Sequence, residues 1–231
     1  MMISKILKLT MILTICVSIW QLWTNFEFYI ANDNFAANQS SQELIKILEK
    51  SGNRVDNAVL YRGYLLFASL ILTIFVTNSL YNKARGKIEH FDLSSKYSKK
   101  RAIGSFFIPF VNLVLPRICI NELEHIMRPD NLNLHDSDSF KKRNRSGDIW
   151  WVLWIVVALF NIRFSSFMES ALESTEELNS LLSILNKYVI GQSFASILLV
   201  ASMLNGVKYF DYLFRLSENN GEFSESETNP L

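Results

Sequence analysis

The sequence predicts an all-α integral membrane protein with four transmembrane helices. The apolar residues, 49% of the 231, are gathered into blocks with few charges, and a spanning helix needs about 20 such residues. The Lys and Arg residues concentrate in one of the segments that connect these blocks, which is typical of multi-span proteins. Only 8 Gly and 4 Pro occur, so the chain is neither low-complexity nor collagen-like.

Four blocks are long enough to cross a bilayer, at about residues 9–29, 63–82, 149–168 and 188–207. The third block contains one charge, Arg163, whose side chain we expect to reach the outer interface because it lies near the end of the block. Lys5 precedes the first block as it would in a signal peptide, but no small-residue cleavage site follows. We therefore expect a retained anchor.

The distribution of basic residues predicts the orientation of the four spans. The segment between the second and third spans carries 13 of the 23 Lys and Arg residues. With both termini inside, 17 basic residues face the cytoplasm and 6 face outward, and basic segments stay cytoplasmic. The N- and C-termini are therefore both predicted to be cytoplasmic.

The basic segment contains a run that is too short to span. Residues 102–116 are charge-free but include Pro109, which favours a re-entrant or interfacial segment over 102–128. Its second part predicts a cytoplasmic amphipathic helix with one face exposed to water. That polar face comprises Arg117, Asn121, Glu124, His125 and Arg128, opposite Cys119, Ile120, Leu123, Ile126 and Met127.

Two regions outside the spans have their own signatures. Ser40 and Glu43 form a capping box, which predicts the start of a short separate helix on the outer side. The sequence Ser-Gly-Asn at residues 51–53 predicts the end of this helix. Residues 218–231 are acidic and almost free of bulky apolar side chains, which predicts a disordered tail. Residues 1–217 are expected to form a single membrane domain.

Small residues recur along the last span at helical spacing. Gly191, Ala195, Ser202 and Gly206 fall on one face of a helix, and small residues let neighbouring helix backbones approach closely. We expect this stripe to pack against another span or a second copy of the chain.

Two motifs resemble a known family. Residues 106–116 read FFIPFVNLVLP, and residues 150–154 read WWVLW. This pair resembles bacterial multi-span membrane proteins that are catalogued as a domain of unknown function, over roughly residues 60–215. The resemblance implies a bacterial inner-membrane location and no known activity. Its motif residues are Phe107, Pro109, Asn112, Pro116, Trp150, Trp151 and Trp154.

The chemistry of catalysis is not visible in the sequence. No nucleophile elbow, zinc-protease motif or phosphate-binding loop occurs, and Glu122 with His125 lacks the second pair that a di-iron site needs. The net charge of +1 gives no reason to expect nucleic-acid binding. We expect no catalytic residues, no metal and no cofactor.

Two functions stay open at this point. The first is a non-enzymatic membrane protein that acts through association, with a membrane-protein partner or with itself, through its cytoplasmic loop and tail. The alternative is a small transport or channel subunit that uses the Pro-broken segment near Pro109. In both cases the lipid bilayer is a partner.

The predicted orientation can be tested with reporter fusions. Because the basic residues favour cytoplasmic termini, a fusion after Asn53 is expected to report the outer side and a fusion after Gly147 the cytoplasm. Reporters that are active on only one side of the membrane give the measurement. The same signal from both fusions would contradict the four-span arrangement.

Overall fold

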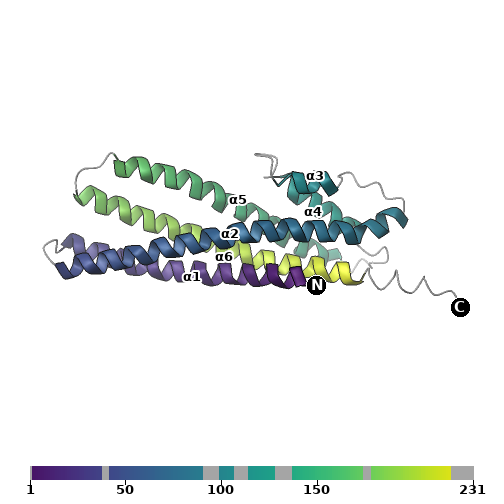
Figure 1. The fold of residues 1–231 in the computed structure, drawn as a ribbon, viewed down its shortest axis with the longest axis horizontal. Coiled ribbons are helices and arrows are strands. Elements are labelled where there is room, and N and C mark those ends of the chain that lie inside the picture. Colours follow the sequence, from purple (N-terminus) through teal and green to yellow (C-terminus); the bar gives the residue numbers. More distant parts are fainter. Residues whose placement is uncertain are drawn as a thin grey trace. The chain divides into compact units, whose positions relative to one another are not determined.

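The computed structural model describes residues 2–37, 42–90, 99–106, 114–127, 137–173 and 178–219, and all regular structure in these ranges is helical (Figure 1). The helices follow in the order α1 Met2–Ala37, α2 Gln42–His90, α3 Lys99–Gly104, α4 Leu115–Ile126, α5 Ser137–Glu173 and α6 Leu178–Asn219.

Four helices are long and apolar enough to cross a membrane, as predicted. The candidate spans are Met2–Ala37, Ile45–Ala84, Arg145–Met168 and Asn179–Glu218, and each contains one of the predicted blocks. Three of them have 36 or 40 residues. At about 1.5 Å per residue, each of these three helices is longer than the hydrocarbon core of a bilayer, which is about 30 Å thick.

The prediction of a separate outer helix that ends at residues 51–53 is wrong. Helix α2 begins at Gln42 and continues without a break through Gly52. Glycine weakens a helix by only about 1 kcal/mol, and tertiary packing outweighs that cost. A Cβ at position 52 would lie 3.4 Å from Cε2 of Phe28, so the backbone of α2 runs close to this ring.

The chain divides into two compact units. Unit 1 comprises Met1–Met11, Ala68–Trp151 and Asn205–Leu231, and unit 2 comprises Ile12–Phe67 and Val152–Leu204. The long helices α1, α2, α5 and α6 each contribute residues to both units. The single membrane domain over residues 1–217 stays a prediction.

Unit 2 is held by apolar and aromatic packing between helices. Phe28, Val55 and Val189 form a buried cluster that joins α1, α2 and α6. Phe164 of α5 stacks on Tyr188 of α6, with ring centroids 6.0 Å apart. Gly191 makes room for Phe164, because a Cβ there would lie 2.2 Å from Cζ of that ring.

Unit 1 buries one side of the short helix α4. Its buried residues are Pro116, Arg117, Cys119, Ile120, Leu123 and Glu124. The expected water-exposed face is therefore wrong for Arg117 and Glu124, although His125 is exposed. Two charged side chains turn inward because polar groups on α5 and α6 receive them.

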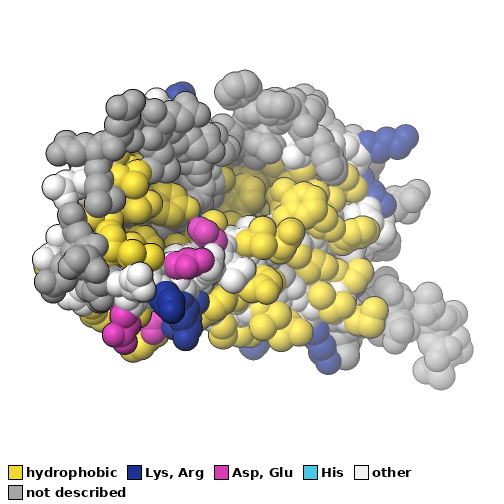
Figure 2. All heavy atoms as spheres, turned by 60° about the vertical axis from the view of Figure 1, so that its left-hand side comes forward, with side chains coloured by type: hydrophobic (Ala, Val, Ile, Leu, Met, Phe, Trp, Pro, Cys, Tyr) yellow, Lys and Arg dark blue, Asp and Glu magenta, His cyan; other side chains and the backbone are white. Residues whose placement is uncertain are grey.

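Large apolar side chains also cover the outside of the helices. Trp23, Phe67 and Phe167 are more than 60% exposed. The face seen in Figure 2 carries a broad hydrophobic area beside a small group of acidic and basic side chains. Such surface is costly in water and suits contact with lipid, in agreement with the four candidate spans.

Several predicted features lie outside the described residues. They are the motif positions Phe107, Pro109 and Asn112, Arg128 of the expected polar face, and residues 220–231 of the acidic tail. The re-entrant path of 102–128 stays a prediction.

Candidate functional site

The buried face of α4 carries a polar cluster that joins three helices of unit 1. Arg117 donates from Nε to Oδ1 of Asp148 on α5 at 2.9 Å and from Nη1 to the hydroxyl of Tyr209 on α6 at 2.7 Å. The Tyr209 hydroxyl donates at 2.9 Å to Oε2 of Glu124, which lies two turns after Arg117 on the same face of α4. We call Arg117, Glu124, Asp148 and Tyr209 the α4 cluster.

The geometry of Arg117 depends on its neighbours as well as on its hydrogen bonds. The guanidinium carbon lies 4.8 Å from the centroid of the Tyr209 ring, within the range of a cation–π contact. At Gly147 a Cβ would lie 2.8 Å from the Tyr209 ring and 2.9 Å from Nη2 of Arg117. Only glycine at this position lets α5 approach so closely.

The carboxyl group of Glu124 is completely buried. Burial raises the pKa of Glu124 above its usual value, whereas the hydrogen bond from Tyr209 and the positive charge of Arg117 lower it by less. The carboxyl therefore holds a proton more strongly than an exposed glutamate does. The α4 cluster combines a permanent cation with an acid that binds a proton when the pH falls.

Aromatic residues lie beside this cluster and bring parts of the two sequence motifs together. Phe106 from the first motif meets Trp151 from the second edge to face, with centroids 6.3 Å apart. Trp150 packs edge to face on Phe210 of α6 at 4.9 Å. Pro116 is also buried, at the start of α4, whereas Trp154 is half-buried. Phe106, Trp150 and Trp151 thus take part in the aromatic packing of unit 1.

A second polar cluster lies in unit 2 around Arg62. This arginine is only 3% exposed, although it belongs to the candidate span of α2. Nη1 donates to Oγ of Ser196 at 3.0 Å, and Nη2 donates to Oε1 of Gln192 at 2.6 Å and to Oδ1 of Asn161 at 3.1 Å. All three acceptors are neutral oxygens, so these bonds satisfy donors of Arg62 without cancelling its charge.

Amide side chains of α1 extend this polar layer along α6. Asn25 donates to the Val189 carbonyl at 3.3 Å and to Oγ of Ser193 at 2.9 Å. Asn32 donates to the Leu182 carbonyl at 2.9 Å and to Oδ1 of Asn186 at 2.7 Å. Gln21 is fully buried, and Ser196 Oγ lies 3.2 Å from its Oε1.

Sequence reasoning overlooked most of these polar residues. The sequence placed one charge, Arg163, within the predicted spans. Arg163 is exposed, whereas Arg62, one residue before the predicted second span, is buried. The spacing of Gln21, Asn25 and Asn32 on one helical face was the available signal.

The small residues of α6 occupy close-packed positions. Ala195 and Ser202 are fully buried, and Gly191 lies against Phe164. At Gly206 a Cβ would lie 2.6 Å from Cδ1 of Trp150. The sequence proposal that this stripe also governs association with a second copy stays a prediction.

Comparison with known proteins shows a family match. A family model described as a domain of unknown function (DUF4328) matches residues 49–210. This range includes the four residues of the α4 cluster and also Arg62 with its three acceptors, whereas the amides of α1, Gln21, Asn25 and Asn32, lie outside it. No curated protein and no solved structure matches the chain. Among the described residues, no group of three or more His, Cys, Asp or Glu is placed to hold a metal.

The effect of Glu124 on stability is expected to depend on pH. The pKa of Glu124 is higher in the folded protein than its unfolded value of about 4.5. The contribution of this carboxyl to the free energy of unfolding is therefore largest below pH 4.5, and it is lost as the pH rises through the folded-state pKa. The substitution Glu124→Gln removes this titration. The melting temperature of the variant relative to that of the wild type, measured in detergent, should therefore rise as the pH increases from 4 to 8.

Glu43→Gln provides the control because this carboxyl is exposed. The melting temperature of Glu43→Gln should change with pH in the same way as that of the wild type. If the Glu124→Gln curve also runs parallel to the wild type across the whole range, the carboxyl does not titrate abnormally in the folded protein.

Proposed function

Since the chain belongs to the DUF4328 family, whose description names no activity, we propose a function from the geometry: a non-enzymatic membrane protein that acts by associating with another protein through α4. The proposed location is a bacterial inner membrane, with both termini and α4 on the cytoplasmic side. The single observation that carries this proposal is the fixation of α4 by the α4 cluster, in which Arg117, Glu124 and Tyr209 are buried and Asp148 is exposed.

The inner face of α4 is anchored to two other helices. Arg117 bonds to α5 and α6, and Glu124 accepts from α6. A helix of 12 residues is marginal by itself in water, so these tertiary contacts supply much of what holds it in place. A surface that is already ordered loses little conformational entropy when a partner binds.

The outer face of α4 has the composition of a contact surface. Val114 and Ile118, four residues apart, are 60% and 41% exposed. Asn121 and His125 continue the same helical face with polar groups. Apolar residues bordered by polar ones are typical of a protein interface, whereas an interfacial lipid contact favours a broader apolar face rimmed by Lys and Arg.

Photo-crosslinking in living cells tests this proposal. A benzoylphenylalanine placed at Ile118 is expected to form adducts with protein, because this position is exposed on the proposed contact face. The same probe at Phe75, an exposed position in the candidate span of α2, is expected to react with lipid. Adducts are identified by mass spectrometry after purification of the full chain. Lipid adducts alone from Ile118 would overturn the proposal.

The second candidate function is a transport or channel subunit. The Pro-broken segment on which it was first based lies outside the described residues, but Arg62 supplies an independent reason. A buried arginine within a candidate span is often functional, and its uncancelled charge would attract an anion.

Anion efflux from proteoliposomes separates the two candidates. Under the association proposal, vesicles that contain the wild-type protein should lose chloride or phosphate no faster than protein-free vesicles. Efflux that Arg62→Gln slows about tenfold or more, while the exposed control Lys50→Gln leaves it unchanged, would establish the transport candidate instead.

A further inference from the structure

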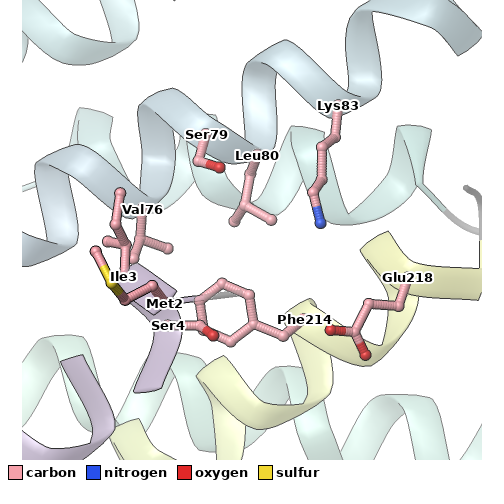
Figure 3. A pocket seen from close by; sticks show the side chains of 9 residues that line it. All are labelled: Met2, Ile3, Ser4, Val76, Ser79, Leu80, Lys83, Phe214 and Glu218. Carbon is pink, nitrogen blue, oxygen red and sulfur yellow. The ribbon is translucent and has the colours of Figure 1, made fainter. Parts of the chain in front are cut away.

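Unit 1 contains a cavity of about 280 Å³ where α1, α2 and α6 meet (Figure 3). Its wall is mainly apolar, with Val76 and Leu80 from α2 and Phe214 from α6. Ser4, Ser79, Lys83 and Glu218 add polar atoms to the lining. Neither of the polar clusters described above contributes to it.

The cavity lies where three candidate spans end. These spans begin at Met2 in α1, end at Ala84 in α2 and end at Glu218 in α6. Lys83 follows directly after the apolar block 63–82, so we place it, with the cavity that it lines, at the level where a membrane changes from hydrocarbon to headgroups. By the predicted orientation this is the cytoplasmic leaflet.

Two opposite charges face the cavity from different helices. Figure 3 shows the Lys83 side chain extending from α2 toward α6, and the Glu218 carboxylate extending from α6 toward the same space. Nζ of Lys83 donates to Oγ of Ser217 at 3.2 Å. An ammonium group has three donors, so this bond orients Lys83 and leaves two donors for a ligand.

We propose that this cavity binds a zwitterionic phospholipid with a primary ammonium headgroup, such as phosphatidylethanolamine. The lipid phosphate meets the Lys83 ammonium, and the lipid ammonium meets the Glu218 carboxylate. The beginning of the acyl chain lies along Val76, Leu80 and Phe214. Each part of the lipid thus contacts a group of matching chemistry.

The size of the cavity agrees with a headgroup and not with a whole lipid. At about 30 Å³ per water molecule, 280 Å³ corresponds to about nine waters. A phosphoethanolamine group has a similar number of non-hydrogen atoms. The acyl chains therefore leave the cavity along the outside of the helices, where exposed apolar side chains such as Phe75 are available.

The charges also discriminate between headgroups. An anionic headgroup such as phosphatidylglycerol would satisfy Lys83 but place no cation beside Glu218. The quaternary ammonium of phosphatidylcholine has no N–H to donate to a carboxylate. Only a primary ammonium combined with a phosphate pairs both residues with charge-assisted hydrogen bonds.

Lipid retention by the full-length protein tests the proposal. The protein is reconstituted with equal amounts of phosphatidylethanolamine, phosphatidylglycerol and phosphatidylcholine, then purified in mild detergent, and the retained lipids are quantified by mass spectrometry. The wild type is expected to enrich phosphatidylethanolamine about fivefold over the other two. Lys83→Gln should abolish the enrichment, and Glu218→Gln should abolish the preference over phosphatidylcholine.

Lys208→Gln is the matched control, because this exposed lysine lies on α6 and does not line the cavity. It should retain lipid like the wild type. Ser79→Trp fills the cavity without changing a charge and should lower phosphatidylethanolamine retention as Lys83→Gln does. A wild type that retains the three lipids equally, or a Lys208→Gln effect as large as that of Lys83→Gln, would overturn the proposal.

Discussion

Pairing polar side chains inside a predominantly apolar helical protein is the constraint on which this structure depends. A hydrocarbon environment offers no water to a buried donor, so polar groups must find partners on neighbouring helices. Tyr209 does this in unit 1, where its hydroxyl accepts from Arg117 and donates to Glu124. Arg62 does it in unit 2 with neutral oxygens from α5 and α6. In each unit the polar contacts select which helices are neighbours, a selection that non-directional apolar contact alone leaves open.

The two clusters use arginine in different ways. Arg117 has carboxylates within its cluster, and its guanidinium also lies over the Tyr209 ring, so its charge is compensated where it sits. Arg62 is bonded only to uncharged acceptors in the contacts described for it. A compensated charge suits a fixed structural contact between helices, and this agrees with the proposed role of α4 as an ordered contact surface. The uncompensated charge of Arg62 is the observation that supports transport as the second candidate function.

Close helix contact around these clusters depends on glycine. Gly147 admits the Tyr209 ring and the Arg117 guanidinium, and Gly206 admits Trp150. In both cases an added methyl group would lie under 3.0 Å from a ring or from the guanidinium. The aromatic residues of the second motif are thereby brought against α6, where Trp150 meets Phe210. The WW pair therefore has a packing role that its sequence position alone does not specify.

The sequence by itself determined the helical class, the four helices that are long and apolar enough to span a membrane and the short helix around Pro116, because hydropathy, length and periodicity are local properties. It also identified the small residues of α6. Only the tertiary structure decided that α2 continues through Gly52 and that Arg117, Glu124 and Arg62 turn inward. A charged residue on a helix has the same local pattern whether it faces water or a buried partner. The partner residues, such as Tyr209 for Glu124, lie far away in the sequence, and only folding brings them together.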